Sequence, residues 1–520
     1  MNVFLMHPDR DFSPPAEGAW DRDELAKDLA LPTLWHAMAA DDEFLYEVAG
    51  RATFGALTND AQTIRYRHAV LRDCQENTEV IDAVYQVALS AIEEKGKSYF
   101  GILSMYPSAV LHGAREVMEI FVRKLRELRL IAEKNEHSFS SDGFRRLFSM
   151  LKEELSEEYL GEVERHLAIL HFRRGVLLSA SLGKDGRGID YVVRLPNADE
   201  RPWWRRLIRR RKSAFTFEIP ERDDAGAQAL NDIQGRGINS VANALAQSME
   251  HILGFFVLLR TELAFYRAQL NLQRQLGSIG ARLCVPTVAP AGSRGLRFDE
   301  MYDVCLALQM GKAIVGNRVD ATGRSLVMIT GANQGGKSSF LRSVGISQLM
   351  FQAGMLVGAD QYESELFQGL FTHYKREEDA GLDSGKFDEE VSRMSRIAKK
   401  IVPNSMLLCN ESFAATNERE GSAIAHDVIR AMLDKGIRVL FVTHFYHLAR
   451  SVVASESGKT LFLRAPRNED GTRSFRLIEG APLETSFGDD LYRRIFGEAL
   501  DRDDEPTQTG LPVTEGTRAE

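Results

Sequence analysis

The chain has 520 residues, of which 44% are hydrophobic and 27% are charged, and this composition excludes wholesale disorder. The length is too great for one ordinary hydrophobic core, so we expect roughly three or four domains. The formal net charge of -9 at pH 7 repels phosphate, so any binding of nucleic acid has to use local basic patches.

The first half of the chain has the pattern of amphipathic helices. After an N-terminal segment, 1–30, we expect a helical region over 31–290, with few strand signals before residue 170. The stretch FLYE at 44–47 lies inside this pattern, and we assign it to core packing. Over 110–128, steps of three and four residues between apolar side chains predict one buried helical stripe. This stripe consists of Val110, Ala114, Val117, Phe121, Leu125 and Leu128.

A longer helical pattern follows at 241–270, where apolar residues alternate steps of four and three. Two interpretations fit it: a free coiled coil, or a long core helix of a bundle. Only about four heptads are present, which favours the core helix. The residues of this seam are Leu245, Met249, Ile252, Phe256, Leu259, Leu263, Tyr266 and Leu270.

Between these helices, a small β insertion is expected near 170–220. Residues 171–196 read as two strands around a glycine-containing turn, and 215–219 as a third strand. A basic run next to Trp203 and Trp204 has two interpretations. It can bind phosphates and stack on bases, or it can be a solvated loop whose tryptophans pack on a neighbouring helix. The candidate nucleic-acid residues in it are Arg205, Arg206, Arg209, Arg210, Arg211 and Lys212.

After a connector at 285–295, strands alternate with helices, and this pattern predicts an α/β domain over 296–500. Residues 325–340, SLVMITGANQGGKSSF, combine an apolar strand, a G-x-x-x-x-G-K-[ST] loop and a helix start, which is the context of a phosphate-binding P-loop. A chance glycine-rich turn is the alternative. The predicted nucleotide-binding residues are Gly331, Ala332, Asn333, Gln334, Gly335, Gly336, Lys337, Ser338 and Ser339.

The next strand, predicted at 405–411, ends in polar residues and places further candidates. Glu411 has the position of a general base that polarises the attacking water. Before it stands Asn410, where a carboxylate is usual, and its neutral amide gives up charge attraction for Mg²⁺. We therefore expect Ser338 and, more weakly, Asn410 to hold Mg²⁺, and ATP hydrolysis to be slow. The alternative is a merely buried strand.

Two more candidates flank this strand in the sequence. The predicted strand at 439–442 ends at His444, which can contact a γ-phosphate or the attacking water. His447 has no such support. Ser384 and Gly385 precede a helix with acidic residues in its first turns, so they form either an anion site or a simple N-cap. The remaining residues, 501–520, are polar and expected to be disordered.

The four cysteines, Cys74, Cys284, Cys305 and Cys409, lie far apart with no C-x-x-C pair. They suggest neither disulfides nor a zinc site, and they fit a reducing cytoplasm. The N-terminus has no basic region followed by a long apolar core. The longest apolar run, 252–259, is broken by Gly254 and is short for a membrane span. We expect a soluble, cytoplasmic protein without a membrane partner.

Several of these motifs together resemble the MutS family. TGANQGGKSSFLR is similar to the P-loop of that family, in which an Asn and a double Gly precede the Lys. The Ser-Gly pair at 384–385, the strand before Glu411, the segment SFAATNEREG at 412–421, and Thr443-His444 recur in family order. RLIEGAPLETSFGDDLYRRIFG at 476–497 resembles the hairpin and the Ser/Thr-x-G helix that close the family's ATPase domain. The resemblance is specific over about 310–497 and weaker over about 30–280.

The resemblance implies an ABC-type ATPase domain, a helical core and levers, and a homodimer that uses ATP and Mg²⁺ to clamp DNA in repair or recombination. Lys337, Glu411 and His444 would be the catalytic residues, and Ser384 would act on the partner subunit's nucleotide. DNA and other repair proteins are the implied partners. The chain begins near the lever region, so we expect a short form without a mismatch-reading domain. Asn410 keeps open a nucleotide-gated scaffold with little turnover, and a protein or RNA partner is a third option.

Overall fold

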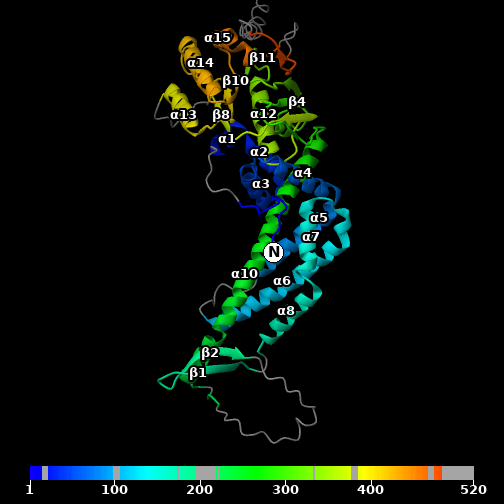
Figure 1. Ribbon diagram of the computed structural model, residues 1–520, viewed down its shortest axis with the longest axis vertical. Helices are drawn as coiled ribbons and strands as arrows, with labels where there is room; N and C mark the ends of the chain where they lie inside the picture. The colour runs from blue at the N-terminus through cyan, green and yellow to red at the C-terminus, as the bar shows by residue number, and fades with distance from the viewer. Residues whose placement is uncertain are drawn as a thin grey trace, which may run out of the picture. The chain divides into compact units, whose positions relative to one another are not determined.

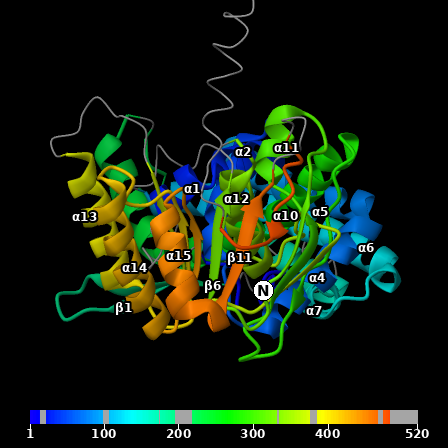
Figure 2. The same cartoon turned by 90° about the horizontal axis from the view of Figure 1, so that it is seen from above.

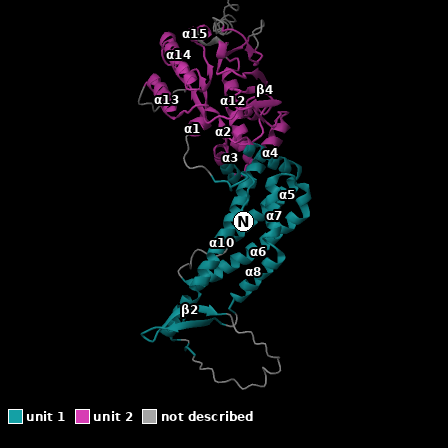
Figure 3. Ribbon diagram, viewed as in Figure 1, with its two compact units in different colours: residues 1–14, 43–49, 62–270 teal, residues 15–42, 50–61, 271–520 magenta. Residues whose placement is uncertain are grey.

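The computed structural model describes residues 1–13, 22–97, 106–172, 175–194, 218–220, 222–331, 334–375, 385–466 and 473–482 (Figure 1). The chain divides into two compact units, each assembled from separate stretches of sequence (Figure 3). Unit 1 comprises 1–14, 43–49 and 62–270, and unit 2 comprises 15–42, 50–61 and 271–520. Two N-terminal stretches, 15–42 and 50–61, therefore belong to the same unit as the second half of the chain. The sequence pattern assigns them to the N-terminal segment and to the helical region.

Unit 1 is built mainly from helices, as predicted. The expected helix at 110–128 lies within α6, and the seam residues Met249, Phe256 and Tyr266 are buried along α10. Phe256 packs against Phe121 of α6 with ring centroids 5.3 Å apart. This burial supports the core-helix interpretation of the seam. The helices are α4 Ala61–Glu76, α5 Thr78–Lys97, α6 Pro107–Asn135, α7 Asp142–Glu153, α8 Glu157–Ile169 and α10 Asp224–Ser278, with η1 at Glu136–Ser138.

A β-hairpin interrupts these helices where the insertion is predicted. Strands β1, Leu177–Leu182, and β2, Gly188–Arg194, pair antiparallel, and Gly186 in the turn has a φ of 76°. Val193 of β2, and Val176 just before β1, pack on a small cluster that includes Leu111 and Ile238. The third predicted strand lies mostly outside the described residues. The basic run 201–212 and both of its tryptophans lie entirely outside them.

Unit 2 contains a six-stranded sheet in the order β12-β11-β6-β10-β9-β8, in which all pairs are parallel except β11 with β12. The predicted strands at 326–329, 405–411 and 439–442 correspond to β6, β9 and β10. The strands are β6 Leu326–Gly331, β8 Leu370–Tyr374, β9 Met406–Asn410, β10 Arg438–Val442, β11 Thr460–Ala465 and β12 Ile478–Glu479.

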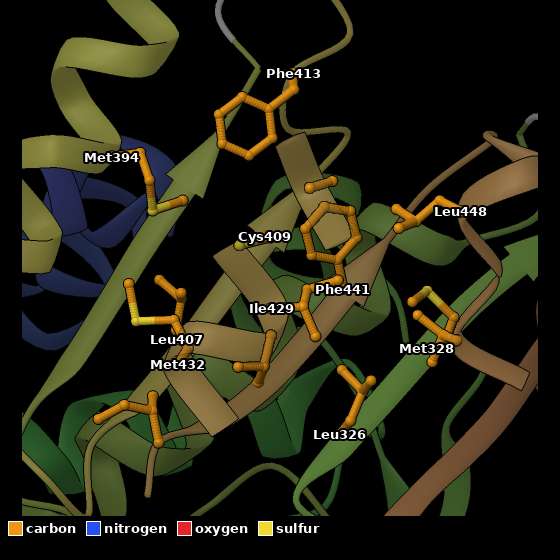
Figure 4. Packing of buried hydrophobic residues seen from close by; sticks show 14 of the residues in the cluster. Leu326, Met328, Met394, Leu407, Cys409, Phe413, Ile429, Met432, Phe441 and Leu448 are labelled. Carbon is orange, nitrogen blue, oxygen red and sulfur yellow. The ribbon is translucent and has the colours of Figure 1, made fainter. Parts of the chain in front are cut away.

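Helices cover both faces of this sheet. Successive strand residues point to opposite sides, so apolar side chains on each face pack against a helix layer. Leu407 and Cys409 belong to a core cluster with α13 Lys386–Lys400, α14 Glu418–Asp434 and α15 Tyr446–Glu456, which lie together on one side (Figures 2 and 4). Leu408, between them, reaches Gly345 of α12, Lys337–Gln352, on the other face. A Cβ at Gly345 would lie 2.8 Å from Leu408 Cδ1, so this glycine permits the close packing.

A second, four-stranded sheet of unit 2 has the order β3-β7-β4-β5. The expected combination of a helical region with a region of mixed sheets is therefore confirmed. The strands are β3 Thr287–Val288, β4 Leu296–Met301, β5 Asn317–Asp320 and β7 Gln361–Ser364. The remaining helices are α1 Arg22–Asp28, α2 Leu31–Ala39, α3 Glu43–Gly55 and α11 Val304–Met310, and η2 spans Ser457–Lys459. FLYE at 44–47 lies inside α3, as expected.

Among the residues that the structure describes, α10 is long and apolar enough to cross a membrane, judged by length and composition alone. The same criterion is met by core helices of soluble proteins and by signal sequences. The buried seam side chains of α10, including Phe256 and Tyr266, give it a packing role within unit 1.

Candidate functional site

The ends of three neighbouring strands bring the predicted site residues to one edge of the six-stranded sheet. Strands β6, β10 and β9 are adjacent and parallel, so their carboxyl ends meet at the same edge. Gly331 ends β6, Asn410 ends β9, and Thr443 and His444 follow β10. Segments more than 70 residues apart in the sequence are thereby assembled around the start of α12, as the strand pattern predicts.

The loop between β6 and α12 has the backbone conformation that its glycines permit. Gly331 has a φ of 107°, and a Cβ there would lie 2.7 Å from the carbonyl oxygen of Ala465 on β11. Gly336 has a φ of 91° and precedes the first residue of α12, so the helix N-terminus is directed at the loop. Gln334 is also left-handed, with a φ of 58°. The predicted residues Ala332 and Asn333 lie outside the described residues.

Lys337 is buried at the start of α12, and its Nζ donates a hydrogen bond to the carbonyl oxygen of Gly331 at 2.8 Å. Burial lowers the pKa of this amine, while the nearby Glu411 carboxylate opposes that shift and Arg473 adds to it. A buried cation beside the loop can stabilise an anion held there, because opposite charges attract strongly away from water. The amine therefore has the location and charge of a phosphate ligand.

Ser338 and Asn410, the two residues predicted to hold Mg²⁺, are in direct contact. The Ser338 hydroxyl donates to Oδ1 of Asn410 at 3.0 Å. Both groups present oxygen atoms, which Mg²⁺ prefers, but both are neutral. Among the described residues, no cluster of three or more His, Cys, Asp or Glu side chains could hold a metal ion. The two oxygens thus fit Mg²⁺ only as supplements to phosphate oxygens.

Glu411 lies beside this pair in a left-handed conformation with a φ of 52°, and its amide donates to the carbonyl oxygen of Val442 at 2.9 Å. Its carboxylate Oε2 is 4.0 Å from Nδ1 of His444, and both side chains remain partly exposed. The two predicted catalytic groups are therefore neighbours. The amide of His447 contacts Glu418 at 3.4 Å, and His447 takes no part in this arrangement.

Lys337, Ser338 and Glu411 line a pocket of about 860 Å³ that also has a wall not predicted from the sequence. The wall comes from the segment 310–317 and from Phe475 and Arg476. Asn317 Oδ1 accepts from the Leu477 amide at 2.7 Å, and Arg476 pairs with Glu300 at 2.5 Å. The segment 310–317 passes close to Glu300 at Gly316, where a Cβ would lie 2.6 Å from the Glu300 backbone.

The pocket brings together most of the predicted nucleotide residues that the structure describes. Gln334, Gly335, Gly336, Lys337, Ser338 and Ser339 line it together with Glu411. Gly385 is elsewhere: it precedes α13, Lys386–Lys400, and is absent from this lining. Ser384, like the basic residues Arg205, Arg206, Arg209, Arg210, Arg211 and Lys212, lies outside the described residues.

Two family models match the chain. Residues 59–279 match the model described as the MutS2 N-terminal domain, and residues 327–493 match the model described as MutS domain V. The second match includes Lys337, Ser338, Asn410, Glu411 and His444, whereas the wall segment 310–317 lies outside it.

Curated proteins named DNA mismatch repair protein MutS are also similar. The protein from Thermus thermophilus is 29% identical over 163 residues, covering 31% of this chain and 20% of that protein. The one from Chloroflexus aurantiacus is 29% identical over 215 residues, covering 37% and 22%. The one from Shouchella clausii is 31% identical over 210 residues, covering 40% and 22%. The chain thus spans about a fifth of the length of the curated relatives that it matches.

Proposed function

We propose, from the premise that this chain belongs to the MutS family, that it binds ATP with Mg²⁺ in the pocket beside α12 and hydrolyses it slowly. The observation that carries the proposal is the assembly of Lys337, Ser338 and Glu411 around one cavity large enough for a nucleotide, with Asn410 in contact with Ser338. We further propose that nucleotide binding controls the clamping of DNA in repair or recombination.

In this proposal each group has a separate role. The loop amides and Lys337 bind the phosphates, with the N-terminus of α12 directed at them. Glu411 orients the attacking water and accepts its proton, and His444, 4.0 Å away, senses the γ-phosphate. The wall formed by 310–317 and Phe475 then receives the nucleoside, since it presents apolar side chains such as Ile314, Val315 and Phe475 to the pocket.

Ser338 and Asn410 are the residues that would hold Mg²⁺. The ion supplies positive charge that offsets the charge developing on the phosphate oxygens during transfer. Because Asn410 is neutral, its carbonyl oxygen supplies a dipole where a carboxylate would supply a full charge. We infer weaker metal retention and slower turnover than a carboxylate at this position would give.

The family resemblance supports the remaining parts of the proposal. In a homodimer, Ser384 and Gly385 of one subunit would complete the other subunit's nucleotide site, with helical levers extending from the ATPase domains. We propose domains at 31–290 and 296–500, preceded by a segment 1–30 and followed by a tail. A cytoplasmic location is proposed on the similarity to bacterial proteins that are named for mismatch repair.

Single-turnover ATP hydrolysis tests the enzyme proposal. The protein and its Glu411→Gln variant are mixed with substoichiometric ATP and Mg²⁺, and the rate of phosphate release is followed. We expect the substitution to slow release by about a hundredfold or more, since a general base contributes roughly 10²–10⁴-fold. The same background rate in both proteins would reject hydrolysis at this site.

A second candidate function is favoured by the neutral amide of Asn410. The chain would then be a nucleotide-gated scaffold, in which ATP stabilises one conformation without appreciable turnover. The hydrolysis experiment separates the two when ATP binding is measured in parallel. Tight ATP binding with background hydrolysis would favour the scaffold, whereas Glu411-dependent hydrolysis would favour the enzyme.

A further inference from the structure

The turn that carries Glu411 is conformationally strained. Glu411 and Phe413 both have left-handed backbones, with φ of 52° and 64°, although neither is glycine. Non-glycine residues keep such conformations only where surrounding contacts enforce them. Ser412 lies between them and is buried. The contacts of Ser412 and Phe413 therefore help to hold the backbone conformation of Glu411, together with the hydrogen bond from its amide to Val442.

His373 on β8 supplies contacts to both of these residues. Its Nδ1 is 2.7 Å from the Ser412 hydroxyl, and that hydroxyl is 2.8 Å from the His373 carbonyl oxygen. The imidazole ring also stacks on Phe413, with centroids 5.4 Å apart and planes inclined by 29°. One buried side chain thus contacts both residues that immediately follow Glu411.

The other ring nitrogen of His373 reaches a different element. Nε2 is 2.9 Å from the carbonyl oxygen of Glu390 on α13. A carbonyl only accepts, so Nε2 carries the proton, and burial lowers the pKa of the ring to about 4, which keeps it neutral. In this tautomer Nδ1 is an acceptor, so it shares the single Ser412 hydroxyl proton with the His373 carbonyl oxygen. The imidazole thereby bridges α13 and the turn.

Helix α13 is itself fixed at this point. Arg393 donates to the carbonyl oxygen of Tyr374 at 2.9 Å, and it pairs with Glu24 at 3.0 Å and with Asp28. Glu390 also contacts the far side of the turn, where its Oε2 lies 3.5 Å from the Ala415 amide. α13 starts at Lys386, directly after Gly385, so His373 connects the turn to the helix that follows the Ser-Gly element.

We propose that His373 is a positioning residue for the hydrolytic step: it links α13 to the strained turn 411–413, so that the placement of Glu411 depends on the position of α13. The inference rests on the proposed ATPase function. It deepens that function by naming a connection inside one subunit between the helix that follows the Ser-Gly element and the proposed general base.

The test compares variants that remove different parts of the bridge. His373→Phe keeps a ring beside Phe413 but loses both hydrogen bonds, and Ser412→Ala loses only the hydroxyl. Ser405→Ala is the matched control, because Ser405 is a buried serine at the opposite end of β9. Single-turnover hydrolysis, equilibrium ATP binding and thermal unfolding are measured for each protein.

We expect His373→Phe and Ser412→Ala to slow single-turnover hydrolysis by about ten- to a hundredfold, as a small misplacement of a reacting group does. ATP affinity should change by less than about twofold, because the P-loop is untouched. The double variant should be no slower than the slower single variant, since both changes break one bridge. His373→Asn and His373→Gln, which each preserve one side of the bridge, should not restore the wild-type rate.

Unchanged hydrolysis in His373→Phe would overturn the inference, as would a loss of rate matched by an equal loss of ATP affinity. Failure of the proposed function has a different signature, namely equal background hydrolysis in the wild type and Glu411→Gln. In that case hydrogen exchange decides: ATP-dependent protection should reach α13 in the wild type but not in His373→Phe. Protection of α13 in both proteins, or in neither, would overturn the inference.

Discussion

Asn410 is the residue on which the speed of the proposed reaction depends most. Its side chain accepts a hydrogen bond from Ser338, so its oxygen is already directed to the place where a metal ligand is expected. The geometry of a carboxylate is therefore present without the charge. At such a position a side-chain oxygen usually has both the right direction and a negative charge. Asn410 has the direction without the charge.

Replacing Asn410 with Asp should add the missing charge without changing the shape of the side chain. We expect less Mg²⁺ to be needed for half-maximal hydrolysis, by about five- to tenfold, since a charged acceptor gains roughly 1 kcal/mol over a neutral one. A magnesium titration of the hydrolysis rate measures this. Asn243→Asp, on the exposed surface of α10, controls for net charge. An unchanged magnesium requirement in Asn410→Asp would exclude Asn410 as a metal ligand.

Glu262 is a second residue with an unusual environment, in the core of unit 1. Its carboxylate accepts from the amides of Leu5 and Met6 at 2.7 and 3.0 Å and from that of Phe12 at 2.6 Å. In Glu262→Gln the side-chain NH₂ would face at least one of these donors. We expect a loss of about 1–3 kcal/mol in unfolding free energy, measured by urea denaturation. Glu250→Gln, exposed on the same helix, should cost almost nothing, and an equally small effect at 262 would refute the expectation.

The same carboxylate should make stability depend on pH. Burial raises the pKa of Glu262 from 4.5 to about 7, although the three amide bonds oppose this shift. A group with a raised folded-state pKa contributes stability below its unfolded pKa and loses that contribution as pH rises through the folded value. Unfolding free energy should therefore fall between about pH 4.5 and pH 7. Glu262→Gln should flatten this part of the profile, and an identical profile in the variant would be contrary evidence.

At the scale of elements, the sequence predicted those parts of the site whose signals are local. The apolar strand before Gly331, the helix that starts at Lys337 and the strand before Glu411 each have their pattern within a short window. The pairing of Asn317 with Leu477, 160 residues later, has no local signal. The same is true of His373, whose partners lie on α13 and after β9. These contacts exist only once the sheet order is set.

The unpredicted wall of the pocket can be tested through Gly316. A Cβ at this position would lie 2.6 Å from the backbone of Glu300, so the segment 310–317 would have to move. We expect Gly316→Ala to weaken ATP binding by at least about tenfold, since losing well-placed contacts worth about 1.4 kcal/mol has that effect. Gly458→Ala is the control, because a Cβ there meets nothing within 4 Å. Equal ATP affinity in both variants would remove this wall from the binding site.

At the scale of the whole molecule, the net charge of -9 constrains how DNA can be bound. The overall field is repulsive to phosphate, so binding has to depend on a confined basic surface and fall with added salt. Competition among homoduplex, mismatched and branched DNA across a salt series tests this. We expect ATP-responsive binding that weakens as salt increases. Binding of RNA or of a protein in place of DNA would instead favour a different partner for the clamp.

Equilibrium binding of Mg²⁺-ATP to the wild type and to Lys337→Ala tests the central claim most directly, because every proposed role depends on a nucleotide in this pocket. We predict saturable binding by the wild type and at least about tenfold weaker binding by Lys337→Ala, as expected for loss of a buried, charge-assisted contact. Thermal unfolding of both proteins controls for folding. Equal affinity of two equally folded proteins, or no binding by the wild type, would contradict the account.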